Sequence, residues 1–163
     1  MLSGRRVAVV AVTLSAIALG GCSNPATGTD SLAAGRDKVV ALVDDAIRTL
    51  PPTAHAATVP TTGTTSCRRK LLGFAAGTTG RHQVEAPVLV QTDAGTSPRP
   101  LLDPIAAAWR AKGYKIDESG LSDARYPKIA ADVPGGYRAV ATAIMTQPQR
   151  LDLYAVSPCL AGS

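Results

Sequence analysis

Aromatic residues are scarce in this 163-residue chain, which contains one Trp, one Phe and four Tyr. A hydrophobic core must therefore consist mainly of Ala, Val, Leu and Ile, and each of these side chains buries less area than an aromatic one. The length suits a single domain. A domain of this size can fold alone, but with so few aromatics additional stabilisation would help it.

Side chains that carry out catalysis are also few. The chain has two histidines, His55 and His82, and no nucleophile motif such as Gly-x-Ser-x-Gly. Asp44 and Asp45 are adjacent on an expected helix, so their carboxylates point apart and make a poor acid–base pair. The glycine-rich stretch 73–80 lacks the Lys-Ser/Thr of a phosphate-binding loop, and the set of three or four zinc ligands is missing. We therefore expect no enzyme, no cofactor, no metal site and no catalytic residues.

A large excess of charge of one sign is missing as well. The formal net charge is +5, and it becomes smaller if Arg5 and Arg6 are removed with an export signal. A protein that binds nucleic acid usually carries a much stronger basic stripe. We expect no nucleic-acid partner.

Residues 1–21 have the layout of an export signal. Arg5 and Arg6 give a short positive start, and the following run, 7–19, is uncharged and almost wholly apolar. Such a run fits the apolar region of a secretory signal and is short of the about 20 residues that a membrane-spanning helix needs. The general secretory route and the twin-arginine route both remain open.

The sequence Leu19-Gly20-Gly21-Cys22 resembles the lipobox of bacterial lipoproteins. The resemblance implies that the Cys22 thiol is diacylglycerylated, so that acyl chains such as palmitate anchor the protein, and that the chain is cut before this residue. Two or more acyl chains give a stable membrane anchor. This implies a lipid-anchored protein at the extracytoplasmic face of the cell membrane. The alternative is an ordinary secretory signal followed by a chance cysteine.

Two further cysteines, Cys67 and Cys159, follow the lipid site. In an oxidising compartment they are expected to form a disulfide, the alternative being two buried free thiols. They are far apart in the sequence, unlike a redox Cys-x-x-Cys pair, which favours a structural bond. Closing a loop of about 90 residues stabilises a fold by about 4–5 kcal/mol in the chain-entropy model.

Local patterns predict two helices. Ser31 or Asp30 can cap a helix over 32–50, and apolar residues follow there at helical spacing. Asp103 and the proline after it are typical of the start of a helix over 102–112, which Gly113 ends. Trp109 lies on the apolar face of this second helix, so we expect it to be buried.

Alternation of apolar and polar residues predicts the strands. Over 81–91 the residues Val84, Ala86, Val88 and Val90 fall on one side, and Pro87 places this strand at an edge or a bulge. Four more strands are expected over 114–117, 128–133, 137–145 and 151–156. The prediction is an α+β fold with an antiparallel sheet of about five strands, two helices packed on one face, and one disulfide. Its parts are a signal peptide (1–21), a flexible tether (22–35) and a single α+β domain (36–163).

One basic cluster stands out among the charged residues, formed by Arg68, Arg69, Lys70 and Arg81. Basic residues next to an anionic surface contribute about 1 kcal/mol each, so the cluster can contact anionic lipid headgroups or an acidic wall polymer. The alternative is a solvated strand and loop with no binding role.

The domain itself resembles the small envelope lipoproteins of actinobacteria. The resemblance spans about residues 36–160 and is carried by the run 109–114 (Trp-Arg-Ala-Lys-Gly-Tyr), by Gly136-Tyr137 and by Ser157-Pro158-Cys159. It implies fold and location and brings no activity with it. The function expected is a non-enzymatic interaction or accessory module that binds an envelope protein or wall polymer. The alternative is a carrier or sensor of a small apolar or lipidic ligand bound between the second helix and the sheet.

Overall fold

The structure is a computed structural model that describes residues 27–71 and 74–162. The expected signal peptide and Cys22 lie outside this range. The elements in chain order are β1 (Thr27–Ser31), α1 (Leu32–Ile47), β2 (Ala54–Ala56), β3 (Gly63–Leu71), β4 (Phe74–Thr92), η1 (Arg99–Leu101), α2 (Leu102–Ala111), β5 (Lys115–Asp117), η2 (Ser119–Ser122), β6 (Lys128–Val133), β7 (Tyr137–Ile144), β8 (Arg150–Val156) and β9 (Cys159–Ala161).

All nine described strands form one sheet with the order β1-β9-β4-β8-β7-β6-β5. The long strand β4 pairs with β8 and β9 along one edge, and with β3 and β2 along the other. Every pairing is antiparallel except that of β1 with β9. The prediction of about five strands and a purely antiparallel sheet was therefore wrong. Four strands were missed: β1, β2, β3 and β9. β1, β2 and β9 have only three to five residues each, too few to show an alternating pattern, and β3 is a mostly polar run with few apolar residues to alternate.

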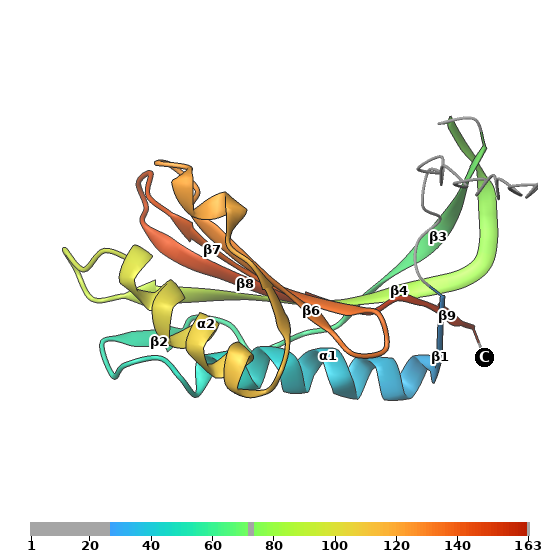
Figure 1. The fold of residues 1–163 in the computed structure, drawn as a ribbon, viewed down its shortest axis with the longest axis horizontal. Helices are drawn as coiled ribbons and strands as arrows, with labels where there is room; N and C mark the ends of the chain where they lie inside the picture. The colour runs from blue at the N-terminus through green and yellow to red at the C-terminus, as the bar shows by residue number, and fades with distance from the viewer. Residues whose placement is uncertain (1–26, 72–73, 163) are drawn as a thin grey trace, which may run out of the picture.

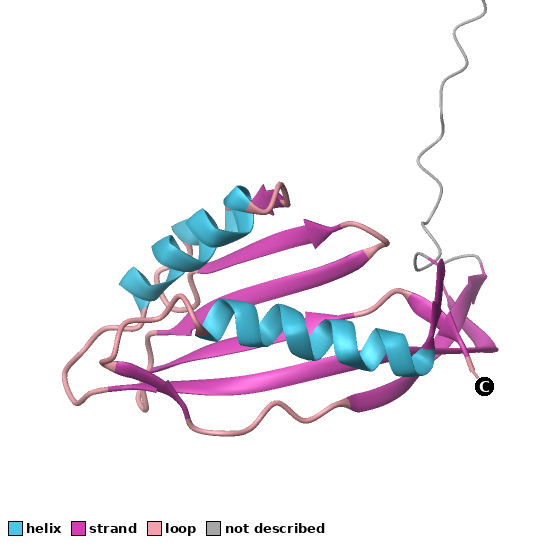
Figure 2. Cartoon of the chain, turned by 90° about the horizontal axis from the view of Figure 1, so that it is seen from below, coloured by secondary structure: helices cyan, strands magenta, loops and turns pink. Residues whose placement is uncertain are grey.

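The two expected helices are present and pack on the same face of the sheet, as Figures 1 and 2 show. Helix α1 begins at its capping residue, since the Ser31 side chain accepts a hydrogen bond of 3.2 Å from the Ala34 amide. The strands turn these side chains toward the helices: Val84, Ala86, Val88, Val90, Ile129, Ala131, Val133, Ala139, Ala141, Ala143, Leu151, Leu153 and Ala155. The core is thus the aliphatic one that the composition requires.

Trp109 lies in this core, with 2% of its surface exposed, as predicted. Helix α2 ends at Ala111, and Gly113 just beyond it has a φ of +76°, the left-handed conformation predicted for the residue that ends this helix. Its start differs, because Asp103 makes no capping hydrogen bond and the 3-10 turn η1 leads into the helix. None of the helices among the described residues is long and apolar enough to cross a membrane.

Residues 27–35, which the sequence assigned to a flexible tether over 22–35, form β1 and the first turn of α1. Composition rich in Gly, Ser and Thr favours a linker, but here Gly28 allows close packing. A Cβ at Gly28 would lie 2.5 Å from Pro158 Cγ and 2.7 Å from Leu160 Cδ2. Residues 27–35 therefore belong to the folded domain that was expected from residue 36 onward.

Pro87 was expected at a sheet edge or a bulge, and it lies where β4 has a partner on one side only. Tyr154 of β8 is its partner. On the opposite edge β3 pairs as far as Glu85 and β2 begins at Val90. Within the described chain, no strand pairs with β4 between those two positions. The proline has no N–H, but no partner strand on that side needs one.

Candidate functional site

The sheet face turned away from α1 and α2, which we call the open face, is exposed at Pro87 and Tyr154, whereas Val140 and Ala130 on the same face are only 5% and 7% exposed. Cross-strand pairing aligns the outward side chains of β4, β8, β7 and β6 in rows that run across the strands. In the central row the cross-strand partners are Pro87 and Tyr154, Tyr154 and Val140, and Val140 and Ala130. We call these four residues the apolar row.

Charged side chains border the apolar row on both sides. One neighbouring row consists of Glu85, Val156, Arg138, Asp132 and Lys115, and the other of Leu89, Asp152, Thr142 and Lys128. Asp117 continues the apolar row on β5, and Arg150 lies beyond the second charged row. Four basic and four acidic residues thus share this face, and neither sign dominates.

Ion pairs hold part of this charge pattern in place. Arg138 lies 3.6 Å from Asp132 and 3.8 Å from Asp117, measured between guanidinium nitrogen and carboxylate oxygen. Hydrogen bonds from Ser119, followed by the charge of Arg138, lower the pKa of Asp117. Asp117 therefore keeps its negative charge at neutral pH at the end of the apolar row.

Two hollows lie along the apolar row and meet at Tyr154. The first, of about 300 Å³, is lined by Asp117, Ser119, Gly120, Lys128, Ala130, Arg138, Val140 and Tyr154. The second, of about 330 Å³, is lined by Glu85, Pro87, Val88, Leu89, Asp152, Leu153 and Tyr154. Leu89 and Tyr154 are 42% and 41% exposed, which is high for large apolar side chains. Tyr154 is therefore the centre of the open face.

Sequence reasoning missed this face. Alternation within each strand identifies outward positions, such as Pro87 between the buried Ala86 and Val88. It does not tell which outward residue of one strand lies beside which of the next, since that depends on register. The apolar row becomes visible only when β4, β8, β7 and β6 are aligned.

The predicted disulfide is confirmed. Cys67 of β3 and Cys159 of β9 are bonded, with 6.1 Å between their Cα atoms. Both strands pair with β4, on opposite edges. The bond therefore crosses over the sheet and fastens β9 to the β3–β4 hairpin.

The basic cluster is divided by the structure. Arg68, Arg69 and Lys70 follow Cys67 along β3, and Arg68 is exposed. Arg81, in contrast, is half-buried: its Nε donates to Cys159 O at 2.9 Å and its Nη2 to Gly28 O at 2.6 Å. Arg81 thus ties β4 to β9 and β1.

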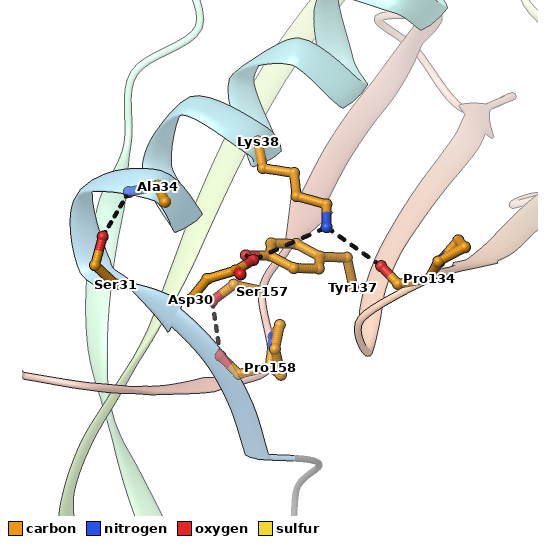
Figure 3. A network of polar contacts seen from close by, with 8 residues as sticks. All are labelled: Asp30, Ser31, Ala34, Lys38, Pro134, Tyr137, Ser157 and Pro158. Atoms are coloured by element: carbon orange, nitrogen blue, oxygen red, sulfur yellow. Dashed lines mark hydrogen bonds and ion pairs between the residues drawn. The ribbon is translucent and has the colours of Figure 1, made fainter.

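A polar cluster fastens the start of the domain (Figure 3). The Tyr137 hydroxyl donates to Asp30 Oδ2 at 2.6 Å, and Lys38 Nζ lies 4.1 Å from the centre of the Tyr137 ring. The same Lys38 ammonium donates to Pro134 O at 3.3 Å. Burial, followed by the bond to Asp30 and its negative charge, raises the pKa of Tyr137. β1, α1 and β7 are joined at this point.

The space between α2 and the sheet, where an apolar ligand was the alternative expectation, is occupied by core side chains. Leu102, Ile105 and Trp109 are each at most 2% exposed there. The indole Nε1 of Trp109 is buried and makes no hydrogen bond within the described chain.

The histidines lie apart, His55 exposed on β2 and His82 half-buried on β4. Across residues 27–71 and 74–162, no three His, Cys, Asp or Glu side chains are grouped to bind a metal ion. Comparison with protein-family models, curated proteins and solved structures finds no match for this chain.

Proposed function

We propose that this protein is exported, is held at the extracytoplasmic face of the cell membrane by acyl chains on Cys22, and acts there as a non-enzymatic interaction module. The binding surface is the open face of the sheet, and the partner is another envelope protein. The observation that carries the proposal is the exposed part of the apolar row, Pro87 and Tyr154, which lies between two charged rows with a hollow on either side of Tyr154.

The chemistry of the open face favours a protein partner over an acidic polymer. Protein interfaces combine an apolar centre, often with Tyr, and a polar rim. Here Tyr154 supplies exposed apolar area in the apolar row, and Leu89 adds more in the row beside it. An acidic polymer is attracted by a surface of one positive sign, whereas this rim alternates Arg138 and Lys128 with Asp117 and Asp132.

The packing between α2 and the sheet also supports an interaction module. A carrier needs a cavity lined by apolar side chains. The position expected for that cavity is taken by Leu102, Ile105 and Trp109, which are almost fully buried. The open face is therefore the better place for a ligand, and its shallow, charged rim suits a macromolecule.

The native mass of the protein in detergent-solubilised membranes tests the binding role. Wild type is expected to elute in a complex larger than a single chain in its detergent micelle, and Leu89→Arg/Tyr154→Arg is expected to elute as that single chain, because both side chains are exposed and their replacement spares the core. The matched control is Tyr126→Arg, at an equally exposed tyrosine that lines neither of the two hollows. Elution of wild type as a free chain, or an unchanged complex with the double variant, contradicts the binding role.

The anchor is tested separately. Cys22→Ala should move the protein from the detergent phase to the aqueous phase, or leave the uncut precursor, because the thiol that takes the lipid is gone. Partitioning equal to wild type contradicts the anchor and leaves the binding role untouched.

A further inference from the structure

We propose that the β3–β4 hairpin is a second membrane contact that binds the anionic lipid headgroups of the bilayer. The inference rests on the acylated Cys22 proposed above. We call residues 63–71 and 74–84 of this hairpin the basic arm.

Charge of a single sign sets the basic arm apart. The sequence from residue 46 to residue 84 contains no Asp or Glu. Arg68, Arg69 and Lys70 are consecutive on β3, which places three positive charges within one short length of strand. The open face has both signs, so the arm is the part of the described chain that suits an anionic surface.

The arm is a thin, exposed projection. Figure 1 shows the hairpin curving away from α1 and from the other strands. Residues 63–66, Arg68, Gly77 and Thr78 are all exposed, and a two-stranded hairpin is at best marginally stable on its own. Its base is nevertheless fixed, by the Cys67–Cys159 disulfide and by Arg81. Such a projection is free to touch another surface without disturbing the core.

The arm begins next to the point where the chain enters the domain. Thr27 is paired with Cys159, Cys159 is bonded to Cys67, and Arg68 is the next residue. Cys22 precedes Thr27 by five positions in the sequence, and five residues span at most about 17 Å. A bilayer that holds acyl chains on Cys22 therefore lies within reach of this end of the molecule.

About 17 Å is the longest that this link can be, so Arg68, Arg69 and Lys70 can come close enough to act on the headgroups. Attraction extends over a Debye length of about 10 Å, and each basic residue near an anionic membrane strengthens binding about fivefold. Arg68, Arg69 and Lys70 together are expected to strengthen it about a hundredfold. The lipid anchor would hold the protein at the membrane, and the basic arm would set the orientation of the domain relative to the bilayer.

The test uses the chain from residue 22 onward with Cys22→Ser, so that no acyl chain contributes. This chain keeps every described residue, and circular dichroism checks its fold. Flotation with vesicles of phosphatidylcholine alone or mixed with phosphatidylglycerol measures binding. We expect binding only to the anionic vesicles, weakened by salt, and reduced about a hundredfold by Arg68→Gln/Arg69→Gln/Lys70→Gln.

The matched control is Arg99→Gln/Arg110→Gln/Arg125→Gln, which removes the same charge from η1, α2 and the segment before β6. This control should keep nearly all of the vesicle binding. Equal binding to neutral vesicles, equal loss in the control, or binding to a soluble glycerol-phosphate polymer without vesicle binding would each overturn the inference. These outcomes do not depend on acylation, so they are distinct from failure of the anchor or of the open face.

Discussion

The hydroxyl of Tyr137 donates a 2.6 Å hydrogen bond to the carboxylate of Asp30, which joins the start of β7 to the first strand of the domain. Tyr137 is 2% exposed, whereas the Asp30 side chain is 39% exposed. The bond thus forms at the boundary between core and solvent, next to the point where the chain enters the domain. The bond holds β1 on the rest of the domain, and β1 is the element through which an anchor on Cys22 would be connected to the domain.

Tyr137→Phe should lower the free energy of unfolding by about 1 kcal/mol at neutral pH, since it removes one hydrogen bond to a charged acceptor that is partly solvated. The pKa of Tyr137 is raised in the folded state, so the folded state keeps a proton that the unfolded chain loses. The bond's contribution is therefore present below about pH 10 and is lost as pH rises above it. Urea unfolding of wild type and variant at neutral pH and above about pH 10 checks this. A loss of unfolding free energy in the variant that stays the same at high pH contradicts it.

Gly35 on α1 is a second contact at the start of the domain. A Cβ there would lie 2.2 Å from Leu160 Cδ1 and 3.7 Å from Tyr137 Oη. Alanine usually stabilises a helix interior by about 1 kcal/mol relative to glycine, but Leu160 is fully buried and cannot move aside. Gly35→Ala should therefore destabilise the protein by about 1–2 kcal/mol.

The control for this prediction is the same change in a Leu160→Ala background. Removal of the Leu160 side chain opens the space, so Gly35→Ala should become neutral or stabilising there. Urea unfolding of wild type, the two single variants and the double variant completes the double-mutant cycle. The same sign of effect in both backgrounds would show that Leu160 is not the obstacle.

Trp109 is the main anchor of α2. Trp109→Ala should lower the free energy of unfolding by about 3–5 kcal/mol through loss of burial and the cavity left behind. Trp109→Phe should cost only about 1–2 kcal/mol, because the ring is largely kept and the lost Nε1 makes no hydrogen bond in the described chain. Since this is the only tryptophan, its emission reports burial directly, and an emission maximum typical of water contradicts the prediction.

The Cys67–Cys159 disulfide should contribute much of the stability of the domain. Cys67→Ser/Cys159→Ser should lower the free energy of unfolding by about 4–5 kcal/mol, because the closed loop is long. Mass spectrometry of a non-reduced digest should find these two cysteines joined. Two alkylatable thiols in exported protein would contradict the bond.

Local signals in the sequence were sufficient for much of the fold. Ser31 at the start of α1, Gly113 after α2 and the alternation of Val84, Ala86, Val88 and Val90 each depend on residues close in the chain. The strands 128–133, 137–145 and 151–156 were predicted to within a residue of β6, β7 and β8. The disulfide followed from cysteine number and compartment.

Contacts between distant segments could not be predicted in this way. β1 forms because Gly28 fits against Pro158 and Leu160, residues about 130 positions later. Arg81 was assigned to the basic cluster on its charge, yet its guanidinium binds carbonyls of β1 and β9. The apolar row likewise needs the register of four strands. In each case the deciding neighbour lies far away in the sequence.

The most direct test of the binding role is photo-crosslinking from position 154 in intact cells. Benzoylphenylalanine placed at Tyr154, in the middle of the open face, should give a discrete adduct with one envelope protein. The same probe at Tyr126, which has nearly the same exposure, 43% against 41%, should not give it. No adduct from position 154, or the same adducts from both positions, would contradict the claim that the open face of the sheet is the binding surface.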